Sequence, residues 1–229
     1  MKKIKKRQYK TSDGSPTLYM EAFDEYYHSK HGAIQEANYV YLEKGLVYWM
    51  LQSPQKKECT IFEMGFGTGL NAILTAEVAK TQKKQIHYHT IEAYPLTSKE
   101  LNDVGYSDFL STELAALFSQ VHQVEWEVSQ KISDFFYLKK YQTLLNEFSS
   151  YQKYDIIYYD AFGARTQPEL WEDECFPSLI QSLNPGGVFV TYSAKGSVRR
   201  ALTSLGLSVS LIPGPPGKRE MIRAIKPHL

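Results

Sequence analysis

The sequence predicts an α/β fold in which a mostly parallel sheet is covered by helices on both faces. From about residue 59 onward, short apolar runs alternate with amphipathic stretches of helical period. Three glycines at alternate positions follow the first apolar run, a pattern that permits a tight turn with unusual backbone dihedral angles. With 229 residues, the chain is long enough to bury the core of one domain.

Apolar runs of five or six residues predict five strands of a parallel sheet. The most strongly predicted strand, Tyr154–Tyr159, is short, aromatic and β-branched. A hairpin across Pro213–Gly217 is expected to end the chain and to bring one antiparallel strand into a sheet of seven strands. In order, the predicted parallel strands cover residues 59–64, 86–91, 124–128, 154–159 and 188–192, and the hairpin strands cover 207–212 and 220–225.

Apolar residues recurring every three or four positions predict a helix after each of these strands except the last two. The second helical region is expected to break near Gly105, and Asn184–Gly187 is expected to end the fourth helix and turn the chain. In order, the predicted helices cover about 70–78, 98–119, 133–148, 171–183 and 198–205.

Residues 1–50 do not follow the alternation, and they are rich in aromatic and charged side chains. We therefore expect an N-terminal extension over residues 1–50, packed over the ligand-binding edge of the sheet. The remaining residues, 51–229, are expected to form the ligand-binding domain.

Composition limits the class of protein. No apolar run reaches the roughly 18 residues that span a bilayer, and no apolar segment of a secretory signal follows the basic start of the chain. The two cysteines, Cys59 and Cys175, lie in apolar segments and predict neither a disulfide framework nor a metal site. A cytoplasmic protein is expected. The formal net charge of +1 neither supports nor excludes nucleic acid as a partner.

The turn after the first strand predicts a ligand site. In open α/β sheets, ligands bind at the carboxyl ends of the strands. Leu70 stands where a dinucleotide-binding fingerprint would have glycine or alanine, so the spacing suits a ligand without a pyrophosphate. Glu63 could accept a hydrogen bond from an ammonium group. The residues expected to bind this ligand are Glu63, Gly65, Phe66, Gly67, Thr68, Gly69 and Asn71.

Two further acidic residues directly follow predicted strands. Glu92 follows the second strand, where a carboxylate can accept hydrogen bonds from both hydroxyls of a ribose. Asp160 follows the fourth strand and precedes a glycine-containing loop, a common place for a reacting group. After the third strand, Glu127, Ser129 and Asp134 are alternatives for holding an adenine amine. His28 and His31 have no evident third ligand, so no metal site is predicted.

These residues occur within a longer ordered set. The set comprises Phe23–Tyr27 with Ser29, Gly32 and Glu36; Glu63–Asn71; Ile91–Glu92 with Pro95–Thr97; Asp160–Phe162 with Pro168 and Trp171; Pro185–Gly187; Val198–Arg200; and Gly217–Met221. With this set, the chain resembles the methyltransferase domain of the bifunctional enzyme that makes 5-methylaminomethyl-2-thiouridine at the tRNA wobble position. The resemblance implies a Rossmann-like class I methyltransferase fold.

The resemblance also implies an activity. S-Adenosylmethionine would be held by Glu63, the glycine loop and Glu92, and its methyl group would pass to the amine of an aminomethyl-uridine beside Asp160. The substrate would be the tRNA anticodon stem-loop, and the segment from Tyr27 to Glu36 would close over the target base. The chain would be coupled in function to the enzymes that install the aminomethyl group. Basic residues expected to contact the tRNA, with binding that weakens as salt rises, are Arg199, Arg200, Lys218 and Arg219.

The sequence departs from the family in two places. The flavin-dependent oxidase domain is not contained in the 229 residues, so no FAD is expected, and no metal is needed. The family tends to have Gly-Asp where this chain has Val128-Ser129, so the adenine contacts do not carry over. Two alternative functions are an aminopropyltransferase related to spermidine synthase and a non-catalytic nucleotide- or RNA-binding module.

Overall fold

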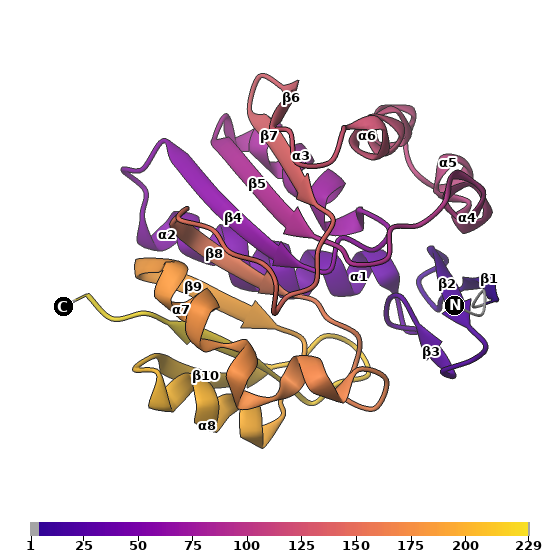
Figure 1. Ribbon diagram of the computed structural model, residues 1–229. Coiled ribbons are helices and arrows are strands. Elements are labelled where there is room, and N and C mark those ends of the chain that lie inside the picture. Colours follow the sequence, from indigo (N-terminus) through magenta and orange to yellow (C-terminus); the bar gives the residue numbers. More distant parts are fainter. Residues whose placement is uncertain (1–4, 229) are drawn as a thin grey trace.

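The computed structural model describes residues 5–228, which form a large and a small β-sheet (Figure 1). Within these residues, the large sheet has eight strands in the order β10-β11-β9-β8-β4-β5-β7-β6. Its central strands are parallel: β4 (Glu58–Met64), β5 (Gln85–Ile91), β7 (Phe136–Tyr141), β8 (Tyr154–Tyr159) and β9 (Leu183–Thr191). Antiparallel pairing adds β6 (Gln130–Ser133) to β7, β11 (Glu220–Ile225) to β9, and β10 (Ser208–Pro213) to β11.

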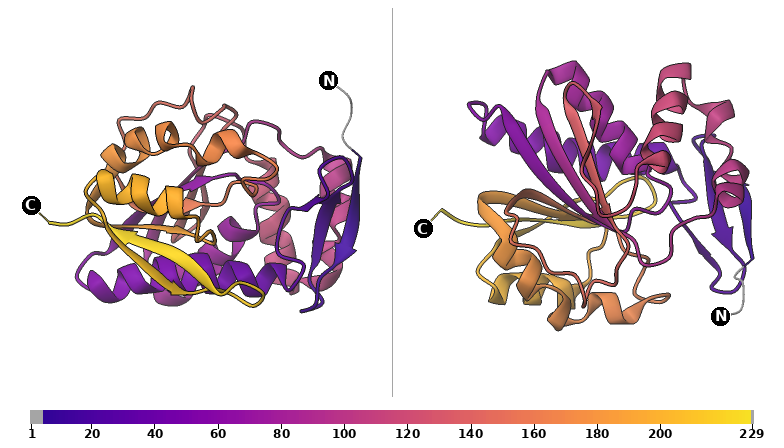
Figure 2. Two further views of the ribbon diagram at one scale, coloured as in Figure 1. Left: turned by 90° about the horizontal axis from the view of Figure 1, so that it is seen from below. Right: turned by 45° about the horizontal axis from the view of Figure 1, so that its top comes forward.

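Helices cover both faces of this sheet, so its central strands are buried on both sides (Figure 2). In β4, Cys59 and Ile61 face one core, and Phe62 and Met64 face the other. The first core is closed by α3 (Leu70–Gln82) and α6 (Thr112–Gln123), and the second by α7 (Pro177–Ser182) and α8 (Gly196–Ser204). The short elements between these are α4 (Ser98–Val104), α5 (Tyr106–Phe109), η2 (Pro168–Trp171) and η3 (Asp173–Cys175).

The N-terminal segment divides into two parts. The small sheet, β1 (Lys6–Lys10), β2 (Pro16–Met20) and β3 (Glu25–Tyr26), lies on the side toward which the central strands point (Figure 1). The chain then forms one continuous helical segment, α1 (Ala33–Ala37), the π-helical η1 (Asn38–Val47) and α2 (Tyr48–Gln52), which packs into the first core. A boundary near residue 50 falls inside α2, and the division into an extension and a domain stays a prediction.

The predicted α/β fold with a C-terminal hairpin is confirmed, and four of the five predicted parallel strands lie where the sequence places them. The helical region over 98–119 does break at Gly105, which has a φ of 78° and ends α4. The sheet has one strand more than predicted, because β6 extends its edge within the described residues.

The third parallel strand was predicted in the wrong place. It is β7, over Phe136–Tyr141, and the helix predicted over 133–148 does not form. Val124–Val128 contains only an isolated bridge from Trp126 to Lys140. In β7, Phe136, Leu138 and Lys140 point inward, and Lys140 is only 1% exposed. A lysine at an inward position hides the two-residue alternation that identifies a strand.

The segment from 171 to 187 also differs from its prediction. Only Pro177–Ser182 is α-helical, and two short 3₁₀ turns, η2 and η3, precede it. Asn184–Gly187 lies within β9 rather than in a turn. The pairing of β9 with β8 is irregular there, and Gly186 has a φ of 74°. Glycine is favoured at such an irregularity in a strand as well as in a turn, so Gly186 alone does not distinguish the two.

Candidate active site

The carboxyl ends of the central strands open onto one large cavity of about 1640 Å³. The residues that directly follow the five parallel strands all line it: Gly65 after β4, Glu92 after β5, Gln142 after β7, Asp160 after β8 and Tyr192 after β9. Tyr27, Glu36 and other residues of the N-terminal segment also line the cavity, and the ring of Tyr27 lies beside Gly67. This is the edge of the sheet at which the sequence predicts a ligand site.

The glycine loop forms one wall of the cavity. Gly65 and Gly67 have φ angles of 91° and 51°, which only glycine adopts readily. A Cβ atom at Gly65 would lie 2.9 Å from the carbonyl oxygen of Asp160. The absence of a side chain at Gly65 therefore lets this loop approach the backbone that follows β8, and Gly65, Phe66 and Gly67 line the cavity. Thr68 is buried and Gly69 is the N-cap of α3, and neither of these two lines the cavity.

Two histidines hold the loop at Thr68. The Thr68 hydroxyl lies 3.2 Å from Nε2 of His28, and the Thr68 carbonyl lies 3.0 Å from Nε2 of His122. Burial lowers the pKa of both histidines to about 4, so both are neutral at pH 7. His28 therefore links the small N-terminal sheet to the glycine loop. Within the described residues, no group of His, Cys, Asp and Glu side chains is arranged to hold a metal ion.

Glu92 lies at the cavity with both carboxylate oxygens in fixed positions. Oε2 accepts a hydrogen bond from the backbone N–H of Gly67 (3.0 Å), and Oε1 accepts one from that of Tyr94 (2.9 Å). Each oxygen keeps a lone pair that can accept a hydroxyl group. Glu92 thus connects the loop after β5 to the glycine loop after β4.

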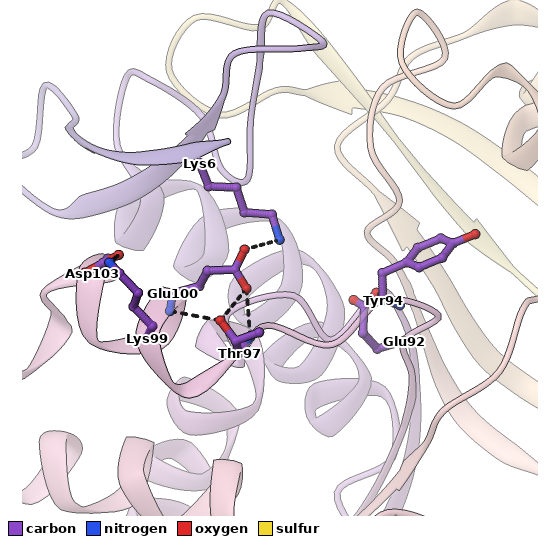
Figure 3. A network of polar contacts seen from close by, with 7 residues as sticks. All are labelled: Lys6, Glu92, Tyr94, Thr97, Lys99, Glu100 and Asp103. Atoms are coloured by element: carbon purple, nitrogen blue, oxygen red, sulfur yellow. Dashed lines mark hydrogen bonds and ion pairs between the residues drawn. The ribbon is translucent and has the colours of Figure 1, made fainter. Parts of the chain in front are cut away.

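A capping box stabilises the segment that follows Glu92 (Figure 3). Glu100 N–H donates to the Thr97 hydroxyl (3.3 Å), and Thr97 N–H donates to the Glu100 carboxylate (2.8 Å). Lys6 of β1 forms an ion pair with the same carboxylate (3.0 Å). The small sheet is therefore anchored to the start of α4, close to Glu92.

Asp160 is half-buried at the centre of the cavity wall. Its Oδ1 accepts a hydrogen bond from the Tyr41 hydroxyl (2.6 Å), and its Oδ2 accepts one from the Asn71 side-chain amide (2.8 Å). Burial raises the pKa of Asp160 to about 6, the bond from Tyr41 opposes this rise, and the nearby Glu36 carboxylate adds to it. The carboxyl group can therefore gain or lose a proton near physiological pH.

Glu63 lies behind the cavity wall and is fully buried. Its Oε1 accepts from the Asn71 amide (3.1 Å), and its Oε2 has no hydrogen-bond partner among residues 5–228. Burial is the main reason that the pKa of Glu63 rises to about 8, and the negative charge of Asp160 adds to the rise. Asn71 lines the cavity and connects the two carboxyl groups.

Of the residues predicted to contact a substrate, three line the cavity: Tyr27, Glu36 and Lys218. Lys218 forms an ion pair with Glu36 (2.5 Å) and lies 3.7 Å above the ring of Tyr192. The ring of Tyr27 meets that of Phe162 edge-on, with their centroids 4.9 Å apart. The three arginines, Arg199, Arg200 and Arg219, are exposed outside the cavity lining.

Sequence reasoning missed several residues that line the cavity. Tyr192 was predicted as the last residue of the fifth strand, but β9 ends at Thr191, so Tyr192 is the first residue after it. Gln142 and Thr143 were missed because the third strand was predicted in the wrong place. Of the residues predicted after that strand, Glu127 lines a smaller neighbouring pocket, and Asp134 lies in the turn between β6 and β7. Tyr41 gave no signal, since it stands in a helix far from any strand end.

Comparison with known proteins identifies the family. A family model described as an S-adenosyl-L-methionine-dependent methyltransferase matches residues 106–227. The chain belongs to this methyltransferase family. Its fold is that of a class I methyltransferase, and its cofactor is S-adenosylmethionine.

The resemblance to the methyltransferase domain of a bifunctional tRNA-modifying enzyme is also confirmed. The relatives include the "tRNA 5-methylaminomethyl-2-thiouridine biosynthesis bifunctional protein MnmC" of Marinomonas sp. strain MWYL1, 29% identical over 91% of this chain and 32% of that protein. The protein of the same name from Idiomarina loihiensis is 30% identical over 87% of this chain and 35% of that protein. The methyltransferase thus spans about a third of the length of these relatives.

A solved structure, MNMC2 from Aquifex aeolicus, has a similar fold. It matches this methyltransferase with a TM-score of 0.80 at 22% identity, over the whole of this chain and 74% of the other. Within residues 5–228, none of the helices of the methyltransferase has the length and apolar character needed to cross a membrane.

The residues at the cavity fit the cofactor of the family. Gly65 and Gly67 leave the backbone accessible, and Glu92 can accept the two hydroxyls of a ribose. S-Adenosylmethionine carries a sulfonium and an ammonium group, and carboxyl groups in or behind the same wall favour such a cation.

We expect cofactor binding to release a proton near neutral pH. Free Glu63, with a pKa of about 8, is mostly protonated at pH 7, and a cation at the cavity wall would lower that pKa. The contribution of Glu63 to the affinity should therefore rise with pH up to about 8 and level off above it. Calorimetry in buffers of different ionisation enthalpy measures the released protons.

Glu63→Gln is the matched variant, because glutamine resembles the protonated acid in shape. The amino group of the ligand titrates equally with both proteins, so only the difference between them reports Glu63. Equal proton release by the two proteins would contradict the prediction.

Proposed function

We propose that this chain transfers a methyl group from S-adenosylmethionine to the primary amine of 5-aminomethyl-2-thiouridine at the tRNA wobble position. The observation that carries the proposal is the similarity, over 87–91% of the chain, to proteins named for 5-methylaminomethyl-2-thiouridine biosynthesis in tRNA. A cavity that contains a carboxylate, Asp160, beside the glycine loop supports it.

In this proposal, residues at the ends of β4 and β5 bind the cofactor. Glu92 accepts the ribose hydroxyls, the backbone of the glycine loop contacts the cofactor, and Asn71 and Glu63 face its methionine end. Phe66 and Thr68 stand between the glycines and help to fix the conformation of the loop. S-Adenosylmethionine supplies an electrophilic methyl group. The residues assigned to the cofactor are Glu63, Gly65, Phe66, Gly67, Thr68, Gly69, Asn71, Glu92 and Asp160.

Asp160 is the proposed catalytic residue. An alkylamine has a pKa of about 10.4, so most of it is protonated at neutral pH and cannot act as a nucleophile. Asp160 accepts the proton, directly or through a water molecule, or orients the neutral amine. The hydrogen bonds from Tyr41 and Asn71 keep its carboxylate in one orientation. Holding the amine in line with the methyl group lowers the barrier by on the order of 7–11 kcal/mol.

The size of the cavity is consistent with two substrates. Its volume of about 1640 Å³ exceeds the roughly 300–1,000 Å³ of a typical small-molecule site. We place the flipped-out wobble base of the anticodon stem-loop between Tyr27 and the Glu36–Lys218 pair. The exposed Arg199, Arg200 and Arg219 would contact phosphates outside the cavity. The protein would act in the cytoplasm, after the enzymes that install the aminomethyl group.

We predict that only tRNA carrying the primary aminomethyl group is methylated. A carboxymethylaminomethyl group is larger and adds a negative charge, which Glu36 and Asp160 in the same cavity would repel. The assay is methyl transfer to purified tRNAs bearing either side chain, followed by nucleoside mass spectrometry. Equal methylation of both tRNAs, or methylation of small amines but of no tRNA, would overturn the proposed function.

A further inference from the structure

Tyr41 reaches the proposed catalytic carboxylate from the N-terminal helical segment. Its hydroxyl lies 2.6 Å from Oδ1 of Asp160, although the two residues are 119 positions apart. The side chain is only 1% exposed. Tyr41 lies outside residues 106–227, which the family model matches. Its contact with Asp160 is thus a feature that the family match by itself does not contain.

The packing around Tyr41 holds this hydroxyl in place. Its ring packs against that of Tyr158, with their centroids 5.2 Å apart. Tyr158 lies two residues before Asp160 in the chain, so both side chains point to the same face of the sheet. Gly45, one helical turn after Tyr41, brings the helix close, because a Cβ there would lie 3.1 Å from Tyr158 and from Val190.

The other oxygen of Asp160 also receives a donor. The Asn71 amide donates to Oδ2 at 2.8 Å, and that amide nitrogen has hydrogens but no lone pair to offer. Two donors, one on each oxygen, favour the ionised form of a carboxyl group over the protonated form. The hydroxyl of Tyr41 is the one of these two donors that can be removed without altering the glycine-loop helix.

We propose that Tyr41 is a positioning residue, whose hydroxyl keeps Asp160 ionised and oriented toward the acceptor amine. The inference rests on the proposed function, because it gives Asp160 the role of proton acceptor or orienting group. Tyr41 also lines the cavity, and its proposed role is exerted through its hydrogen bond to Asp160.

The charged and titratable groups around Asp160 determine how a pH test must be interpreted. Glu36 of α1 brings negative charge and Lys218 brings positive charge, whereas Glu63 of β4, whose pKa burial raises to about 8, is mostly protonated over the acid limb. The phenols of Tyr192 and Tyr88 also interact with the carboxylate, but burial raises the pKa of both well above the usual value. Substituting Tyr41 by phenylalanine changes none of these groups directly.

The expected result for Tyr41→Phe is a shift of the acid limb of the pH–rate profile. Without the hydroxyl, the ionised form of Asp160 loses stabilisation, so its pKa rises and activity is lost at a higher pH. A hydrogen bond to a charged group corresponds to a shift of about one to two pH units. At pH 6 the variant should be several-fold slower than the wild type, and above pH 8 the two rates should converge, with KM for S-adenosylmethionine unchanged.

Tyr39→Phe is the matched control. Tyr39 lies in the same helix, and its hydroxyl donates to the carbonyl of Pro213 (3.0 Å) rather than to Asp160. Its substitution should leave the midpoint of the profile unchanged. A uniform loss of rate at every pH in Tyr41→Phe would indicate a merely structural role and would overturn the inference.

A direct titration separates this inference from the proposed function. The side-chain carboxyl carbon of Asp160, labelled with ¹³C and assigned by its loss in Asp160→Asn, reports its pKa without any RNA substrate. A higher pKa in Tyr41→Phe than in the wild type and Tyr39→Phe supports the inference, and an unchanged pKa overturns it. A higher pKa in a protein that methylates no aminomethyl tRNA would overturn the proposed function instead.

Discussion

Replacing Asp160 by asparagine is expected to reduce the rate of methyl transfer by roughly 10²-fold or more, a larger effect than its effect on cofactor affinity. A positioned general base contributes about 10²–10⁴-fold to a rate. Asparagine keeps the size of the side chain but cannot take up the proton. Its amide would also place a donor opposite the Tyr41 hydroxyl or the Asn71 amide, both of which donate to the present carboxylate.

Single-turnover kinetics with saturating S-adenosylmethionine measure this loss, and calorimetry measures the affinity. Asp134→Asn is a suitable control, because Asp134 is exposed in the β6–β7 turn and forms an ion pair with Lys131. A wild-type single-turnover rate in Asp160→Asn would remove Asp160 from the mechanism.

Replacing Glu92 by alanine is expected to weaken cofactor binding strongly and to leave the fold intact. Each charge-assisted hydrogen bond to a ribose hydroxyl contributes roughly 1.5–3 kcal/mol, or about 10- to 100-fold in affinity. The variant also loses the two bonds by which Glu92 fixes the N–H groups of Gly67 and Tyr94 (Figure 3 shows Glu92 and Tyr94). The glycine loop would therefore be less well ordered for the ligand.

Calorimetry with S-adenosylmethionine tests this prediction. Glu92→Gln keeps one acceptor oxygen and should fall between the wild type and Glu92→Ala. Glu113→Ala, an exposed carboxylate on α6 that pairs with Lys80, should bind like the wild type. If folded Glu92→Ala protein binds with unchanged affinity, the ribose role assigned to Glu92 is wrong.

Three of the residues at the cavity that the sequence identified share one property. Gly65, Glu92 and Asp160 directly follow short apolar strands, and the ends of parallel strands meet at one edge of the sheet. Local patterns of apolar and polar residues are enough to find such positions.

The third strand was missed for a reason that lies in tertiary contacts. Lys140 is buried in β7 because its Nζ donates to the carbonyls of Val121 (2.9 Å) and His122 (3.3 Å) at the end of α6. It also lies 4.8 Å above the ring of Trp126. These partners cannot be identified from the sequence, and a lysine without known partners is predicted to be exposed. The alternation of buried and exposed residues in β7 was therefore not recognised.

The sequence by itself determined the α/β class, the glycine loop and the two carboxylates Glu92 and Asp160, because each depends on residues adjacent in the chain. Only the tertiary structure decided the position of β7, the burial of Glu63 behind Asn71, and the contact between Tyr41 and Asp160. These depend on groups far apart in the sequence, whose hydrogen bonds and desolvation exist only once the sheet and its helices have packed.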